Sequence, residues 1–168
     1  MAKIPKHIGF EEKGKKAERS TDVYLPKGGA ATFCEQCKAV YRNKRWSMEP
    51  PGPGSSGKGA RKTGGVCPAC QRIRDANPAG VLTLSGAYFL EHENDILNMI
   101  KHLEANTRDK NPLARIMEIS QEKDVLTIAT TDAKLAQKLG KEIYKAHKGE
   151  LNFQWSQAET FSRVNWNR

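Results

Sequence analysis

Two pairs of cysteines constrain this chain more than any other feature of its sequence. Cys34 and Cys37 form one C-x-x-C pair, Cys67 and Cys70 form the other, and 29 residues lie between the pairs. Two intervening residues allow one tight turn to direct both sulfur atoms toward one metal ion, and two such turns complete a tetrahedron with Zn–S bonds of about 2.3 Å. The spacing therefore predicts a zinc ion held by Cys34, Cys37, Cys67 and Cys70.

Other uses of four cysteines fit the sequence less well. Two disulfides are typical of secreted chains, and the first residues, MAKIPKHIGFEEKGKK, lack the apolar segment of a secretory signal. A thioredoxin-like redox pair needs a strand before the motif and a helix after it. Iron in a rubredoxin-like site uses the same four thiolates and stays an alternative to zinc. Four thiolates also close the coordination shell, which predicts a structural metal rather than a catalytic one.

The positive charge of the chain is concentrated in its first part. The formal net charge is +9; residues 1–30 carry seven Lys/Arg and four Asp/Glu, residues 31–78 carry nine and three, and residues 79–168 carry twelve of each. A localised positive field predicts a polyanionic partner. We therefore divide the chain into a flexible basic N-terminal arm (1–30), a four-cysteine zinc ribbon with a long basic Gly/Pro loop (31–78) and an α+β domain (79–168).

The stretch from Pro50 to Gly65, PPGPGSSGKGARKTGG, resembles a phosphate-binding loop at seven of eight positions, Gly52-x-x-x-x-Gly57-Lys58. The eighth position is Gly59 instead of the Ser or Thr whose hydroxyl binds Mg²⁺, and no buried strand precedes the motif. We therefore expect no nucleotide at this stretch and interpret it as a basic loop between the two cysteine pairs.

Cations interleaved with aromatic residues surround this loop. Such a pattern suits single-stranded or irregular RNA, because cations meet phosphates and rings stack on bases. Alternatively, Tyr41 and Trp46 pack against the ribbon, and some of the cations balance the negative charge of four thiolates around one divalent ion. The predicted nucleic-acid contacts are Arg42, Lys44, Arg45, Trp46, Lys58, Arg61, Lys62, Arg72 and Arg74.

Apolar periodicity predicts the elements of the second domain. The expected order is a strand at 81–85, a helix at 87–106, strands at 115–120 and 124–130, a helix capped by Thr131 or Asp132 and ended by Gly149, and strands at 151–155 and 161–166. This order matches a split βαβ, ferredoxin-like domain, an antiparallel sheet with both helices on one face. The last strand is extra, and it either extends the sheet or closes a hairpin.

Nothing in the sequence calls for catalysis or for a membrane. The four histidines are scattered, no G-x-S-x-G nucleophile motif occurs, and no apolar run approaches the roughly 20 residues that span a bilayer. We therefore predict a non-enzymatic, cytoplasmic binding protein with no membrane contact.

One resemblance is carried by the two cysteine pairs, by Tyr41 and Arg45-Trp46, and by the run CPACQRIRDANPAGVLTLSG from Cys67 to Gly86. These motifs resemble a family of small bacterial zinc-ribbon proteins, and later motifs from Thr131 to Leu151 extend the resemblance over roughly residues 31–168. The cysteine region is also similar to the zinc-binding part of the Nmd-type adaptors that escort the large ribosomal subunit, although this chain has no room for their further domains.

The resemblance implies binding to structured RNA, in particular ribosomal RNA or a ribosomal subunit, with ribosomal proteins as further partners. Two rival expectations remain. One is a DNA-binding or transcription-associated zinc ribbon, and the other is a protein–protein adaptor with a structural zinc whose charge serves solubility alone.

Overall fold

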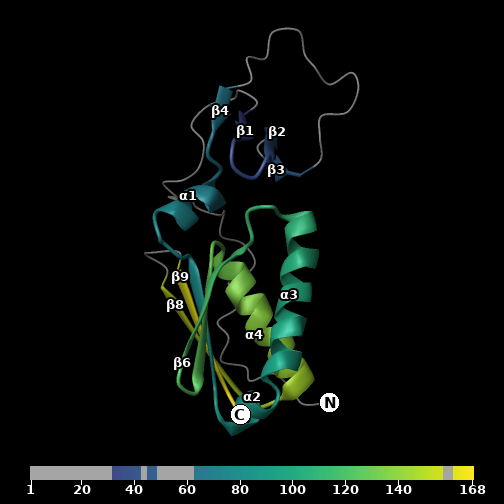
Figure 1. The fold of residues 1–168 in the computed structure, drawn as a ribbon, viewed down its shortest axis with the longest axis vertical. Coiled ribbons are helices and arrows are strands. Elements are labelled where there is room, and N and C mark those ends of the chain that lie inside the picture. The colour runs from purple at the N-terminus through teal and green to yellow at the C-terminus, as the bar shows by residue number, and fades with distance from the viewer. Residues whose placement is uncertain (1–31, 43–44, 49–62, 157–160) are drawn as a thin grey trace, which may run out of the picture.

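The computed structural model describes residues 32–42, 45–48, 63–156 and 161–168. These residues form two units stacked along the long axis of the molecule, a small four-stranded sheet with one helix and a five-stranded sheet with three helices (Figure 1). The predicted α+β class, with a cysteine region ahead of a mixed domain, is confirmed. The predicted basic arm and residues 50–62 of the predicted basic loop lie outside the described residues.

The first unit, which we call the ribbon, holds both cysteine pairs. Its elements are β1 (Thr32–Cys34), β2 (Val40–Arg42), β3 (Arg45–Ser47), β4 (Thr63–Gly65) and the helix α1 (Pro68–Arg74). The strand order is β3-β2-β1-β4, with β1 antiparallel to β2 and parallel to β4. Proline is suited to the first position of α1, because the N–H that it lacks would have no partner inside the helix.

The second unit is the α+β domain. Its strands are β5 (Gly80–Ser85), β6 (Ile116–Glu122), β7 (Val125–Thr130), β8 (Glu150–Ser156) and β9 (Phe161–Asn167), in the order β6-β7-β5-β9-β8. Its helices are α2 (Ala87–Glu91), α3 (Glu93–Lys110) and α4 (Ala133–His147). Figure 1 shows α3 and α4 side by side on one face of this sheet.

The last strand, β9, closes a hairpin with β8 and lies between β8 and β5. It runs parallel to β5, so the sheet is mixed rather than wholly antiparallel. Burial explains this order. Ser162, Val164 and Trp166 of β9 are all buried beneath the helices, whereas Leu151 and Phe153 of β8 are only partly buried. The strand with the more completely buried face takes the interior position, and β8 becomes an edge.

The helix expected at 87–106 is in fact two helices. His92 leaves the helical conformation at φ −117° and ψ 19°, while its N–H still donates to the carbonyl oxygens of Tyr88 and Phe89. The short helix α2 buries Phe89, and the longer helix α3 buries Ile96 and Ile100. The break at His92 lets both segments direct apolar side chains into one core.

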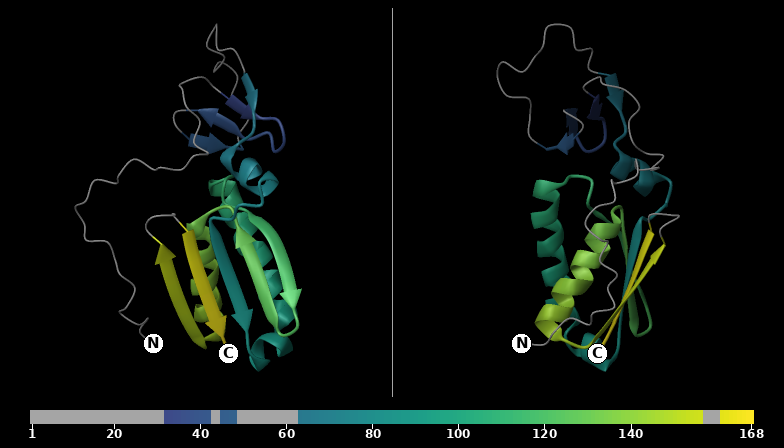
Figure 2. Two further views of the ribbon diagram at one scale, coloured as in Figure 1. Left: turned by 90° about the vertical axis from the view of Figure 1, so that its left-hand side faces the viewer. Right: turned by 180° about the vertical axis from the view of Figure 1, so that it is seen from behind.

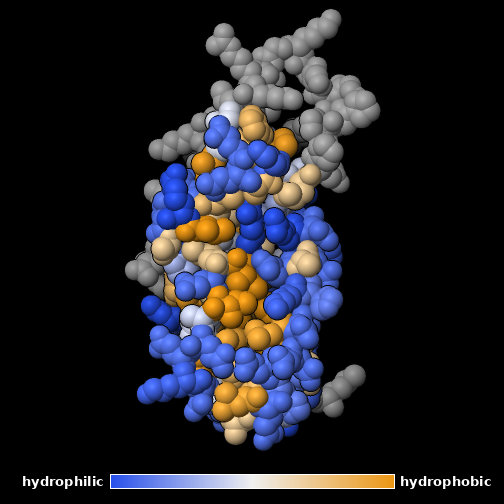
Figure 3. Space-filling view, viewed as in Figure 1, coloured by the Kyte–Doolittle hydropathy of each residue, from blue (hydrophilic) through white to orange (hydrophobic). Residues whose placement is uncertain are grey.

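The α+β domain has a large apolar core between the sheet and the helices. Its fully packed members come from β5, β7, β9 and all three helices, together with one residue of the loop after α3, namely Leu82, Leu84, Phe89, Ile96, Ile100, Ala114, Leu126, Ile128, Leu135, Ala136, Leu139, Ile143, Val164 and Trp166. On the face seen in Figure 3, apolar surface gathers in the middle of this domain, where β6 and α3 flank it. None of the helices among the described residues has both the length and the apolar character needed to cross a membrane.

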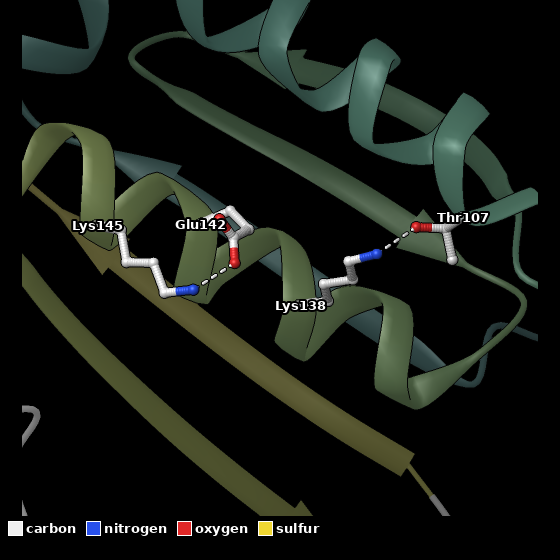
Figure 4. A network of polar contacts seen from close by, with 4 residues as sticks. All are labelled: Thr107, Lys138, Glu142 and Lys145. Atoms are coloured by element: carbon white, nitrogen blue, oxygen red, sulfur yellow. Dashed lines mark hydrogen bonds and ion pairs between the residues drawn. The ribbon is translucent and has the colours of Figure 1, made fainter.

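Polar contacts add little to the packing of the two long helices. Lys138 of α4 donates to the hydroxyl of Thr107 in α3 at 2.8 Å, and Lys145 pairs with Glu142 of its own helix at 2.6 Å (Figure 4). Both contacts are exposed, and exposed pairs of this kind contribute at most about 1 kcal/mol. The apolar core therefore holds α3 and α4 in place.

The opposite face of the five-stranded sheet is covered by no described helix (Figure 2, left). One row across this face is polar and uncharged along its whole length, from β6 to β8, and consists of Ser120, Thr127, Thr83, Asn165 and Asn152. This alternation of a buried and a polar face is what a sheet with one solvated side requires.

Helix α4 approaches the sheet so closely that glycine is needed at the contact. A Cβ atom on Gly140 would lie 2.5 Å from Cγ1 of the buried Val164. We expect Gly140→Ala to destabilise the protein, because overpacking costs about 1–3 kcal/mol and outweighs the gain of about 1 kcal/mol in helix propensity. Urea denaturation measures the change. In a Val164→Ala background the same substitution should stabilise, and a stabilised single variant would contradict the packing described.

Candidate metal centre

The four cysteines lie together at one side of the ribbon. All four are free thiols, and their Sγ atoms lie within 4.8 Å of one another. Cys34, Cys67 and Cys70 are buried, and Cys37 is partly buried. The cluster is therefore arranged to hold a single metal ion, as the spacing of the two pairs predicts.

Local backbone structure places each sulfur. Cys34 ends β1 and Cys37 lies in the turn that follows, whereas Cys67 is the N-cap of α1 and Cys70 lies in its first turn. Backbone N–H groups point at the sulfurs: that of Cys67 lies 3.3 Å from Sγ of Cys34, and that of Cys70 lies 3.4 Å from Sγ of Cys67. The N–H of Cys37 lies 3.5 Å from the same Sγ of Cys34. Donors of this kind stabilise negative charge on the sulfur atoms.

A cation from the other domain completes the surroundings of the cluster. Arg115 directs Nη1 to Sγ of Cys70 at 3.4 Å and Nη2 to Sγ of Cys67 at 3.6 Å. Its Nε donates to the carbonyl oxygen of Pro112 at 2.8 Å, and the residue is only 8% exposed. A buried guanidinium needs such partners, because an unpaired buried charge is strongly destabilising.

Thr131, which follows β7, holds the segment from Leu113 to Arg115 in place through its hydroxyl. The Thr131 hydroxyl accepts from the backbone N–H of Arg115 at 2.9 Å and donates to the carbonyl oxygen of Leu113 at 2.5 Å. Leu113 in turn packs against the apolar core of the ribbon. Asp132, rather than Thr131, caps α4, since its carboxylate accepts from the N–H of Lys134 at 3.0 Å. The hydroxyl of Thr131 is therefore used to hold Leu113 and Arg115, both of which contact the ribbon.

Burial and hydrogen bonding act differently on the four thiols. Burial alone would raise the pKa of Cys34, but the N–H groups of Cys37 and Cys67 outweigh it and lower the pKa to about 6. Burial raises the pKa of Cys67, and the nearby Cys37 adds to this shift. Burial also raises the pKa of Cys70, although Arg115 offsets part of the rise. Hydrogen bonding thus favours the thiolate of Cys34, whereas burial opposes the charged forms of Cys67 and Cys70.

Arg115 stays positively charged in this setting. Burial opposes its charge, but the adjacent Cys37 and Cys70 thiolates outweigh burial and raise its pKa. The four sulfurs therefore face a fixed cation in addition to any ion that they bind. Arg115 belongs to no motif that predicts a site. Its one signal in the sequence is its place between the apolar residues Ala114 and Ile116, because a cation on a buried segment needs a polar or anionic partner.

The predicted nucleic-acid contacts fall into three groups. Arg45 and Arg74 are exposed on the ribbon. Trp46 is only 5% exposed and packs in the ribbon core with its ring centroid 5.3 Å from that of Tyr41, so its ring faces are not open to a base. Arg72 is 9% exposed and donates to the carbonyl oxygen of Asn77 at 3.3 Å.

The remaining predicted contacts are not placed in space. Arg42 belongs to β2, but only its backbone is described, and four further residues lie outside the described part of the chain, namely Lys44, Lys58, Arg61 and Lys62.

No protein-family model, curated protein or solved structure matches this chain. Function is therefore inferred from the chemistry of the cysteine cluster and from the distribution of charge.

Metal removal should unfold the ribbon and spare the α+β domain. The ribbon core has six fully packed residues, of which three belong to the cysteine cluster that could hold a metal ion, Cys34, Cys67 and Cys70, and in small metallodomains the free energy of metal binding is free energy of folding. After chelation, or in Cys37→Ser with Cys70→Ser, we expect the NMR amide signals of residues 32–74 to collapse while those of residues 80–167 keep their dispersion. Retained signals from the ribbon would contradict this expectation.

Replacing Arg115 should weaken metal binding. Removal of a group that contacts metal ligands typically lowers metal affinity by about 10- to 100-fold, and Arg115→Met removes the donors to two sulfurs. Arg108→Met is the matched control, because Arg108 is an exposed arginine of the same domain. Competition with a chromophoric chelator measures both affinities. Equal affinities in the two variants would show that the guanidinium does not support the cluster.

Proposed function

We propose that the chain is a non-enzymatic, cytoplasmic zinc-ribbon protein that binds structured RNA, with ribosomal RNA or a ribosomal subunit as its target and ribosomal proteins as further contacts. The observation that carries the proposal is the separation of charge: residues 1–78 hold the whole excess of +9, whereas residues 79–168 hold twelve cations and twelve anions. Phosphate contacts supply most of the affinity of nucleic-acid-binding proteins, and they require such a concentration of cations.

Zinc is the metal that best suits the cluster. Four thiolates leave no open coordination position, which is typical of structural zinc sites. The surrounding N–H donors and the guanidinium of Arg115 would lower the free energy of the anionic cluster without supplying a further ligand. Metal analysis of the purified protein distinguishes zinc from iron, which the same four ligands also accept.

The two units would have different roles in RNA binding. The ribbon would supply phosphate contacts through exposed cations such as Arg45 and Arg74, while the α+β domain would position the ribbon on its target. The resemblance of the cysteine region to the zinc-binding part of the Nmd-type adaptors favours a ribosomal target over other RNA.

Sedimentation provides the first test. If the protein binds ribosomes, it should travel with a subunit or with whole ribosomes when a cell lysate is separated on a sucrose gradient. Binding competition among ribosomes, structured RNA and duplex DNA at one stated salt concentration then separates the RNA proposal from a DNA-binding ribbon. A protein that stays at the top of the gradient and prefers DNA would overturn the proposal.

Charge neutralisation tests the cationic surface itself. Changing Arg42, Lys44, Arg45, Lys58, Arg61 and Lys62 to Gln should weaken binding to structured RNA and reduce the slope of log K against log salt, by about one for each phosphate that the variant no longer binds. The matched control neutralises six cations of the other domain, namely Lys101, Arg108, Lys110, Lys123, Lys141 and Lys145. Unchanged affinity and slope in the first variant would favour a protein–protein adaptor instead.

A further inference from the structure

A cleft of about 320 Å³ lies where the ribbon meets the α+β domain. One wall is α1 of the ribbon, including Pro68 and Arg72, and the opposite wall is the start of α4, including Lys134. Asn111 and Trp155 complete the lining from the loop after α3 and from the end of β8. The cleft therefore exists only while the two units are docked together.

Trp155 gives the cleft an aromatic surface that is open to solvent. Its side chain is 51% exposed, whereas Trp46 is 5% exposed and Trp166 is fully buried. Leu151 and Phe153 precede it at alternate positions of β8 and pack against the domain core. Trp155 therefore lies on the same face of β8, beyond the end of that core. An exposed indole has a π-face on which a planar group can stack.

An exposed cation, Lys134, faces the cleft from the first turn of α4. Arg72 lines the cleft from α1, but it is only 9% exposed and donates to the carbonyl oxygen of Asn77 at 3.3 Å. Asp132 also lines the cleft, and its carboxylate caps α4 by accepting from the N–H of Lys134. The cleft thus offers an aromatic ring, the cation of Lys134 and the amide of Asn111. Together these groups match the base, the phosphate and the polar edges of a nucleotide.

We propose that this cleft binds one unpaired nucleotide of the RNA, with its base stacked on Trp155 and its phosphate held by Lys134. The inference rests on the proposed function and assigns the single-strand contact to Trp155 rather than to Trp46, whose ring is buried. Duplex RNA does not present an unstacked base, so the cleft selects single-stranded segments, loops and bulges. The wall formed by α1 also places the nucleotide beside the ribbon.

The test uses the full metal-loaded chain and two RNA probes, a mixed-sequence single strand of ten nucleotides and a hairpin that carries the same ten as an unpaired loop. Base stacking on an aromatic side chain supports a loss of about 5- to 150-fold in affinity when the ring is removed. We expect Trp155→Leu to weaken binding of both probes within this range and Trp155→Phe, which keeps a ring, to weaken it less. Binding should quench tryptophan fluorescence in the wild type and not in Trp155→Phe.

A pair of lysine variants tests the phosphate contact. Lys134→Met should weaken single-strand binding and lower its salt slope, whereas Lys138→Met, one turn further along α4 and outside the cleft, should change neither. If the wild type and Trp155→Leu bind both probes with equal affinity, and the wild type shows no quenching, the nucleotide cleft is overturned. RNA binding by the ribbon would still stand in that case. A wild type that binds neither probe nor ribosomal RNA would overturn both proposals.

Discussion

The contact between the guanidinium of Arg115 and the sulfurs of Cys67 and Cys70 determines how the two units are joined. A buried guanidinium is tolerated only where anionic or polar partners surround it. Its carbonyl partner, that of Pro112, belongs to its own domain, whereas its sulfur partners belong to the ribbon. Docking of the ribbon and negative charge on the cysteine cluster therefore depend on each other. An ion that holds the four sulfurs as thiolates also strengthens the junction between the units.

The two units differ in what stabilises them. The α+β domain buries fourteen residues in one apolar core, which includes Phe89 and Trp166. The apolar core of the ribbon has six buried residues, and three of them are cysteines. A surface rich in like charges repels itself and adds nothing to folding. A cationic ribbon with so small a core therefore depends on the neutral, well-packed domain beside it and on the ion that its cysteines could hold.

The sequence predicted most features that depend on neighbouring residues, although not the break at His92 between α2 and α3. Each C-x-x-C pair is a local turn, so the clustering of the cysteines followed from spacing, and the apolar periods located the strands and α4. Tertiary features were not accessible in this way. Both β8 and β9 alternate, and only the complete burial of Val164 and Trp166 places β9 inside the sheet. Likewise, Arg115 has sulfur partners in a different unit, which its sequence neighbours do not indicate.

The cleft beside Trp155 follows from the same junction. Its walls come from α1 and α4. Cys67 of the cysteine cluster caps α1, and α4 begins shortly after Thr131, which positions Arg115. A ligand that contacts both walls of this cleft would bind the docked arrangement and not the separated one, and by thermodynamic linkage it would stabilise the arrangement that binds it. The uncovered sheet face offers no such coupling, because its central row from Ser120 to Asn152 is uncharged and lies within one unit. The junction thus brings Lys134, the exposed ring of Trp155 and the helix that carries Cys70 to one cleft.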